Sequence, residues 1–163
     1  MLDTYGAPGV SSACVLLQDR CAVDVNLVLF AAIVGARRAY ALTQDDVDDA
    51  ASVVRPWQDE VVVPLRRVRR RLTGGPDPAP SVATESLRAR IKEIELEAEM
   101  IELERLGAVA RGLTAVEPPV DSTASERAAA AIRLILGPSG RTADEQTAVD
   151  VIACAAAALG DGS

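Results

Sequence analysis

The stretch DVNLVLFAAIVGAR, from Asp24 to Arg37, decides the fold of this chain. Between Leu27 and Ala36 it carries no charged residue, and it is apolar on every face of a helix. A helix with that pattern is buried at the centre of a protein. At about 10–13 residues it is too short to span a bilayer, which needs roughly 20. We therefore expect a central helix surrounded by other helices.

The flanking sequence predicts further helices on both sides. Helical spacing indicates a first helix over residues 9–20, and Thr43 is a favourable N-cap for a third helix that should break or kink at Pro56. The clearest apolar stripe in the chain then follows. Its members are three or four residues apart: Trp57, Val61, Leu65, Val68 and Leu72. Pro64 lies within this segment and predicts a second kink.

Residues 73–84 (TGGPDPAPSVAT) form a predicted linker, because two glycines and three prolines resist both helix and strand. A long acidic helix is expected from Glu85 to about Leu106. It carries the 4-3-4-3 spacing of a packing seam (Leu87, Ile91, Ile94, Ala98 and Ile101) and a second apolar stripe (Leu96, Met100 and Leu103). Fewer than four heptads is short for a solitary coiled coil, so this helix should dock on the N-terminal helices or on a second copy.

The C-terminal part predicts an Ala-rich helical pair. Ser125 or a neighbour should cap the first of these helices, which ends at Leu136, and Thr142 with Glu145 matches a capping box for a helix that runs to about Leu159. No segment is a convincing strand. We therefore expect an all-α fold: a small helical bundle with a long acidic helix and an Ala-rich C-terminal pair. The expected domains are a helical core over residues 1–112, with the linker 73–84, and an extension over residues 113–163.

Composition removes several classes of function. The chain has no histidine, which excludes Ser-His-Asp and Cys-His catalysis and every histidine metal ligand. A net charge of −7 makes it a poor general binder of polyanions. Three cysteines (Cys14, Cys21 and Cys154) without framework spacing predict reduced, largely buried thiols. No secretory signal is evident, so we expect a cytoplasmic protein without a membrane segment.

A polar corner precedes the central helix: Gln18, Asp19, Arg20, Asp24 and Asn26. Two carboxylates, an amide and a guanidinium there could bind a small polar ligand or perform acid–base chemistry. Alternatively, Asp24 caps the central helix while Gln18 and Asn26 bridge two helices, because buried helix ends must be satisfied. We favour the capping interpretation.

An arginine cluster follows Pro64: Arg66, Arg67, Arg69, Arg70 and Arg71. It could bind phosphate or nucleic acid, although aromatic side chains suited to base stacking are absent beside it, apart from Trp57 on the apolar stripe. The acidic helix is an alternative partner within the chain, through inter-helix ion pairs. The glutamates of that helix lack the histidines that a dimetal bundle site uses. We expect no catalytic residue, no metal and no cofactor.

Several pieces of the sequence, in order, resemble an uncharacterised family of small bacterial proteins, mostly proteobacterial, described as a domain of unknown function. They are PGV (8–10), LLQDR (16–20), DVNLVLF (24–30), Trp57 with VVVPLRRVRR (61–70), and RIKEIELEAE (90–99). The resemblance runs from about Tyr5 to Leu106 and implies a cytoplasmic, all-helical protein without a known activity. Family members usually have an aromatic-rich segment before PGV and more tryptophan after DVN, so the N-terminal core should be thinner here.

These observations favour a non-enzymatic interaction or adaptor protein that self-associates through the long helix, with its protein partner unknown. Nucleic-acid binding through the arginine cluster is the second hypothesis, although the acidic charge argues against it. Binding of a small polar ligand at the polar corner is the third.

Overall fold

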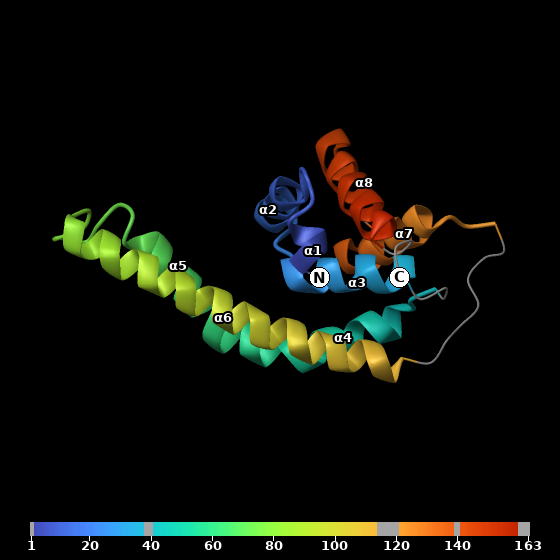
Figure 1. Cartoon of the computed structure of the whole chain (residues 1–163), viewed down its shortest axis with the longest axis horizontal. Coiled ribbons are helices and arrows are strands. Elements are labelled where there is room, and N and C mark those ends of the chain that lie inside the picture. The colour runs from blue at the N-terminus through green and yellow to red at the C-terminus, as the bar shows by residue number, and fades with distance from the viewer. Residues whose placement is uncertain (1, 38–40, 114–120, 139–140, 160–163) are drawn as a thin grey trace. The chain divides into compact units, whose positions relative to one another are not determined.

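The computed structural model in Figure 1 describes residues 2–37, 41–113, 121–138 and 141–159. Helices joined by turns make up this part of the chain, and it contains no strand, which confirms the all-α prediction. The helices are α1 (Leu2–Tyr5), α2 (Val10–Cys21), α3 (Val25–Arg37), α4 (Gln44–Trp57), the π-helical η1 (Gln58–Val62), α5 (Val63–Arg71), α6 (Val82–Gly112), α7 (Ala124–Leu136) and α8 (Ala143–Ala158).

The chain forms two compact units. The first combines Met1–Ala51 with Leu106–Ser163, and the second is Ser52–Arg105. This division differs from the predicted domains, 1–112 and 113–163, because the C-terminal helices belong to the same unit as the N-terminal ones.

The core of the first unit lies among α2, α3, α7 and α8. Side chains from α2 (Val10 and Leu17), from α3 (Val28 and Ala32), and from the C-terminal pair (Ala128, Ile132, Val149 and Ile152) form one buried cluster. A helix that is apolar all round needs partners on several sides, and α2 alone cannot supply them. The small Ala side chains of α7 and α8 let these helices approach α3 and α2 closely.

Helices α3 and α7 approach each other closely at Gly35. A Cβ atom added at Gly35 would lie 2.9 Å from the backbone oxygen of Arg127 and 3.1 Å from the Cβ of Ala131. Only glycine therefore fits at this crossing. Because the contact joins residues far apart in the sequence, local patterns could not predict it.

Side-chain caps fix the starts of the helices in the first unit. Asp24 accepts a hydrogen bond from the backbone N–H of Asn26 (2.9 Å), so it caps α3 as predicted. Thr43 and Asp46 exchange hydrogen bonds at the start of α4. Thr123, a neighbour of Ser125, caps α7 in a capping box with Glu126, and Thr142 caps α8 in the predicted box with Glu145.

The helix that begins at Gln44 does not break at Pro56. Helical structure continues from α4 through η1 into α5, so a break there was a wrong prediction. The irregularity comes before Pro64 instead: the N–H of Val63 bonds to the carbonyl of Gln58, five residues earlier. Proline has no N–H, and its ring clashes with the carbonyl four residues before it. One wider π turn accommodates that ring.

Helix α6 is longer than predicted, spanning Val82–Gly112 rather than 85–106. Ser81 caps the start of α6: its hydroxyl accepts a hydrogen bond from the N–H of Thr84 (3.3 Å), and its N–H donates one to the Thr84 hydroxyl (2.8 Å). The predicted linker, residues 73–84, therefore ends at Ser81, because α6 begins at Val82. In the second unit, α6 lies alongside α5 and the end of α4 (Figure 1).

Candidate functional site

The polar corner does not converge on one point. Asp24 caps α3, whereas Arg20 reaches α8 and forms an exposed ion pair with Asp144 (3.2 Å). Asn26 is buried, Gln18 is half-buried and Asp19 is exposed. Gln18 and Asn26, both in the described part of the chain, form no side-chain hydrogen bond with each other, so the predicted bridge between helices is absent. The corner has the geometry of a helix connection, with one carboxylate as the cap.

The arginine cluster divides into two groups. Arg66 and Arg69 turn toward α6, while Arg67, Arg70 and Arg71 are exposed. The Arg66 guanidinium donates to Glu95 (3.1 Å) and Glu99 (2.7 Å), and Arg69 donates to both oxygens of Glu95 (2.5 and 3.2 Å). We call these four residues the Arg–Glu network. The ion pairs expected between the arginine cluster and the acidic helix are therefore present.

The Arg–Glu network shifts the pKa values of Glu95, Arg66 and Arg69. Burial by itself would raise the pKa of Glu95, but hydrogen bonds from Arg69 and Arg66 outweigh burial and hold this pKa below its ordinary value. Burial acts to lower the pKa of Arg66, and its bonds to Glu95 and Glu99 raise it above its usual range. Glu95, Arg66 and Arg69 therefore stay charged at neutral pH, so their hydrogen bonds between the two helices are charge-assisted.

The pairing runs antiparallel. Trp57 donates its indole N–H to the carbonyl of Ala98 (3.0 Å), whereas Arg69, later in the chain, pairs with the earlier α6 residue Glu95. The face of α6 used in this contact includes Glu95, Ala98 and Glu102, all buried. The predicted seam of α6 is therefore not the centre of its contact.

Three of the five residues of the predicted seam are exposed. Leu87, Ile94 and Ile101, which we call the α6 stripe, are 45–48% exposed, whereas Ile91 and Ala98 between them are half-buried and buried. Members of the stripe are seven residues apart, so they share one helix face. Two members of the second predicted stripe, Leu96 and Met100, are also exposed, on a different face. Exposed large apolar side chains in a row mark interaction surfaces.

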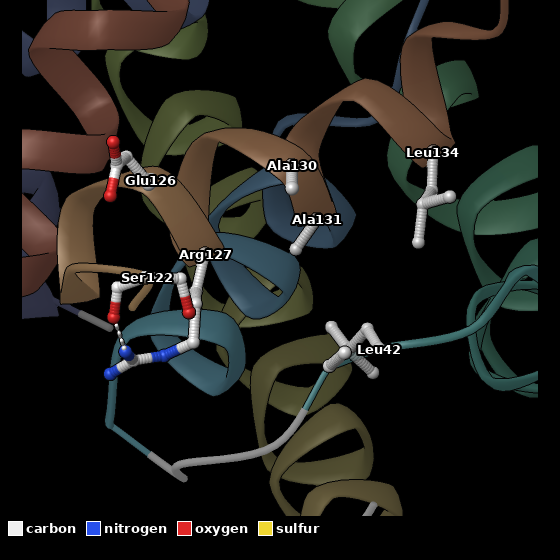
Figure 2. A pocket seen from close by; sticks show the side chains of 8 residues that line it. Leu42, Ser122, Glu126, Arg127, Ala130, Ala131 and Leu134 are labelled. Carbon is white, nitrogen blue, oxygen red and sulfur yellow. Dashed lines mark hydrogen bonds between the residues drawn. The ribbon is translucent and has the colours of Figure 1, made fainter. Parts of the chain in front are cut away.

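The first unit contains a pocket of about 310 Å³ between the residues before α4 and helix α7 (Figure 2). Its wall is mainly apolar and includes Leu42, Ala131 and Leu134. Arg127 lies at one end and donates to the carbonyls of Ser122 (2.5 Å), Gly35 (3.3 Å) and Ala36 (3.3 Å). Since its guanidinium binds the last turn of α3, Arg127 acts as a clamp between helices.

No sequence signal identified Arg127. Its partners Gly35 and Ala36 lie more than 90 residues earlier in the chain, and the sequence around Arg127 has no local pattern that reveals such a contact.

The cysteines are free. Cys14 is buried, and burial raises the pKa of its thiol to about 12, which makes it unreactive at neutral pH. Cys154 is exposed, against the expectation that the thiols are largely buried, and its sulfur lies 3.5 Å from the Ser125 hydroxyl of α7. Among the described residues, no three cysteine, aspartate or glutamate side chains could together hold a metal ion.

Residues 1–106 match the family model described as "Protein of unknown function (DUF2390)". The chain belongs to this family. The match covers 106 of its 163 residues and ends within α6, before the C-terminal pair, so the predicted resemblance is confirmed over nearly the same range. The DUF2390 description carries no activity. The chain matches no curated protein and no solved structure. No helix in the described ranges is long and apolar enough to cross a membrane.

Proposed function

We propose that this DUF2390 protein is a non-enzymatic, cytoplasmic bacterial interaction or adaptor protein that self-associates through α6. The observation that carries the proposal is the α6 stripe. Three large aliphatic side chains stay almost half exposed, while the same helix buries Glu95 and Glu102. Burying a charged group costs free energy, and exposing aliphatic surface forgoes about 25 cal/mol for each Å². A second protein surface packed on the α6 stripe would recover the free energy that the exposed aliphatic side chains forgo.

Light scattering over a concentration series tests the proposal. We expect the full chain to gain mass with concentration, and the triple variant Leu87→Ser/Ile94→Ser/Ile101→Ser to remain a monomer with unchanged helicity by circular dichroism. Val15→Ser is the matched control, because Val15 is equally exposed (49%) but lies on α2. A chain that is monomeric at every concentration, or a control that loses self-association equally, contradicts the proposal.

Nucleic-acid binding through the arginine cluster is the second candidate. The observation in its favour is the exposure of Arg67, Arg70 and Arg71 on consecutive turns of α5. Against it, Arg66 and Arg69 already bind carboxylates, so two of the five positive charges of the cluster are neutralised within the chain. Binding to heparin or DNA that disappears in moderate salt and in Arg67→Glu/Arg70→Glu would support it.

Binding of a small polar ligand at the polar corner is the weakest candidate. Asp24 and Arg20 point to different helices, so the corner does not present a convergent set of polar groups.

A further inference from the structure

The α6 stripe is symmetric about its own midpoint. Leu87 and Ile101 lie seven residues before and after Ile94, which places each about 10 Å along the helix from the centre. A surface with this symmetry complements itself when it is rotated by half a turn about an axis through Ile94. Each large aliphatic side chain then meets another one.

Two of the charges beside the α6 stripe suit an antiparallel pair. Arg90, Glu97 and Glu104 each come three residues after a member of the stripe, so they border it on one side, and all three are exposed. In an antiparallel pair centred on Ile94, Arg90 of one copy lies opposite Glu97 of the other. In a parallel pair in register, the same border of the two copies lies on opposite sides of the contact, so Arg90 of one copy does not meet Glu97 of the other and this ion pair cannot form.

We propose that the partner of the α6 stripe is a second copy of this chain, bound antiparallel, with a two-fold axis at Ile94. Leu87 of one copy packs on Ile101 of the other, and two symmetric Arg90–Glu97 ion pairs border the contact. This inference rests on the proposed function, since it specifies which partner α6 binds and in which orientation. The interface is small, so we expect a Kd of about micromolar order.

Disulfide crosslinking tests the orientation. In the antiparallel pair, Ile94→Cys lies on the axis and should link to itself under mild oxidation. Leu87→Cys alone should not link, because its two copies are about 21 Å apart along the helix, whereas a disulfide needs Cα atoms within roughly 7 Å. Leu87→Cys mixed with Ile101→Cys should link to each other. Peptide mapping by mass spectrometry identifies these bonds separately from those of the three native cysteines.

Exchange of charges gives an independent readout. Glu97→Arg should raise the dimer Kd about tenfold, because it places like charges together at both symmetric positions. The double variant Arg90→Glu/Glu97→Arg should return the Kd to within about threefold of the original. Glu93→Arg is the matched control, as it is exposed on the same helix but farther from the α6 stripe, and it should leave the Kd within about threefold.

The outcomes separate the two proposals. A dimer that links through Leu87→Cys alone and through Ile101→Cys alone is parallel, which overturns the antiparallel inference and leaves the proposed function standing. Failure of the double charge exchange to restore binding also overturns it. A chain that remains monomeric in the light-scattering series removes the proposed self-association itself.

Discussion

The carboxylate of Glu95 lies almost entirely out of water, with a side-chain exposure of 6%, between the guanidinium groups of Arg66 and Arg69. Transferring charged groups from water is costly, and here several charge-assisted hydrogen bonds offset that cost. The intact Arg–Glu network therefore stabilises the fold only modestly. Removing one member leaves the others buried without compensation, so the loss exceeds what the pair contributed.

Glu95→Gln should therefore destabilise the protein by about 2–3 kcal/mol, because Arg66 and Arg69 keep their charges and lose the negative charge and one of the two oxygens that they share. Urea denaturation followed by circular dichroism measures this change. Glu93→Gln, an exposed change on the same helix, should stay within about 0.5 kcal/mol. Equal effects of the two variants would show that the Arg–Glu network does not hold α5 to α6.

The lowered pKa of Glu95 makes stability depend on pH. The folded pKa lies below the ordinary value of 4.5, so between these two values the unfolded chain binds more protons. The contribution of Glu95 is therefore fully present above the ordinary value and is lost as the pH falls through the folded pKa. We expect the difference in unfolding free energy between wild type and Glu95→Gln to narrow as the pH decreases from 7 to 3. A constant difference would contradict this mechanism.

At the polar corner, Asp24→Ala should cost about 1 kcal/mol, since the N–H of Asn26 loses its acceptor at the start of α3. Asp24→Asn should restore most of that loss, because asparagine caps helices equally well. Thermal unfolding measures both variants. If both variants fold normally and yet abolish a phenotype, the corner has a role beyond capping.

Among the elements, α6 shows how far sequence patterns reach. The spacing of Leu87, Ile91, Ile94, Ala98 and Ile101 correctly predicts a helix with an apolar face. It does not predict which part of that face is covered, because the Arg–Glu network rotates the contact toward Glu95 and Glu102. Periodicity reports where apolar side chains lie on one helix, whereas packing depends on the charges of the neighbouring helix.

The crossing of α3 and α7 gives a prediction of its own. Gly35→Ala should destabilise the protein by about 1–3 kcal/mol, because the new methyl group would meet the Arg127 backbone at 2.9 Å. Gly107→Ala in α6 is the matched control. Its nearest neighbour is the end of the Arg111 side chain at 3.8 Å, so the better helix propensity of alanine should stabilise by about 1 kcal/mol. In thermal unfolding we expect Gly35→Ala to lower the stability and Gly107→Ala to raise it. Destabilisation by both variants would contradict the steric explanation.

At the scale of the whole molecule, the caps, most helix bounds and the buried character of α3 could be predicted, since each depends on neighbouring residues. The sharing of one core by α2, α3, α7 and α8 could not. The Ala-rich pattern of α7 and α8 fits many partners equally well, and the hydrogen bonds from Arg127 to α3 join residues that are more than 90 positions apart in the sequence.

Truncation tests this arrangement. A chain of residues 1–112 keeps the segment that matches DUF2390 but lacks α7 and α8, so α2 and α3 lose half of their core. We expect it to lose cooperative thermal unfolding and to bind a hydrophobic dye such as ANS. Addition of a peptide covering residues 121–159 should restore cooperativity. A truncated chain that unfolds as cooperatively as the full one would show that residues 1–112 form a domain by themselves.

The shared core also sets an order of events during synthesis. Helix α3 leaves the ribosome early, but α7 begins only at Ala124, after residues 38–123 have been added. At 5–20 residues per second this interval lasts roughly 4–17 s. For that time the most apolar segment of the chain has neither of its C-terminal partners, and nascent chains on one messenger carry the same uncovered surface side by side. The nascent chain therefore exposes for several seconds an apolar surface that the finished molecule buries.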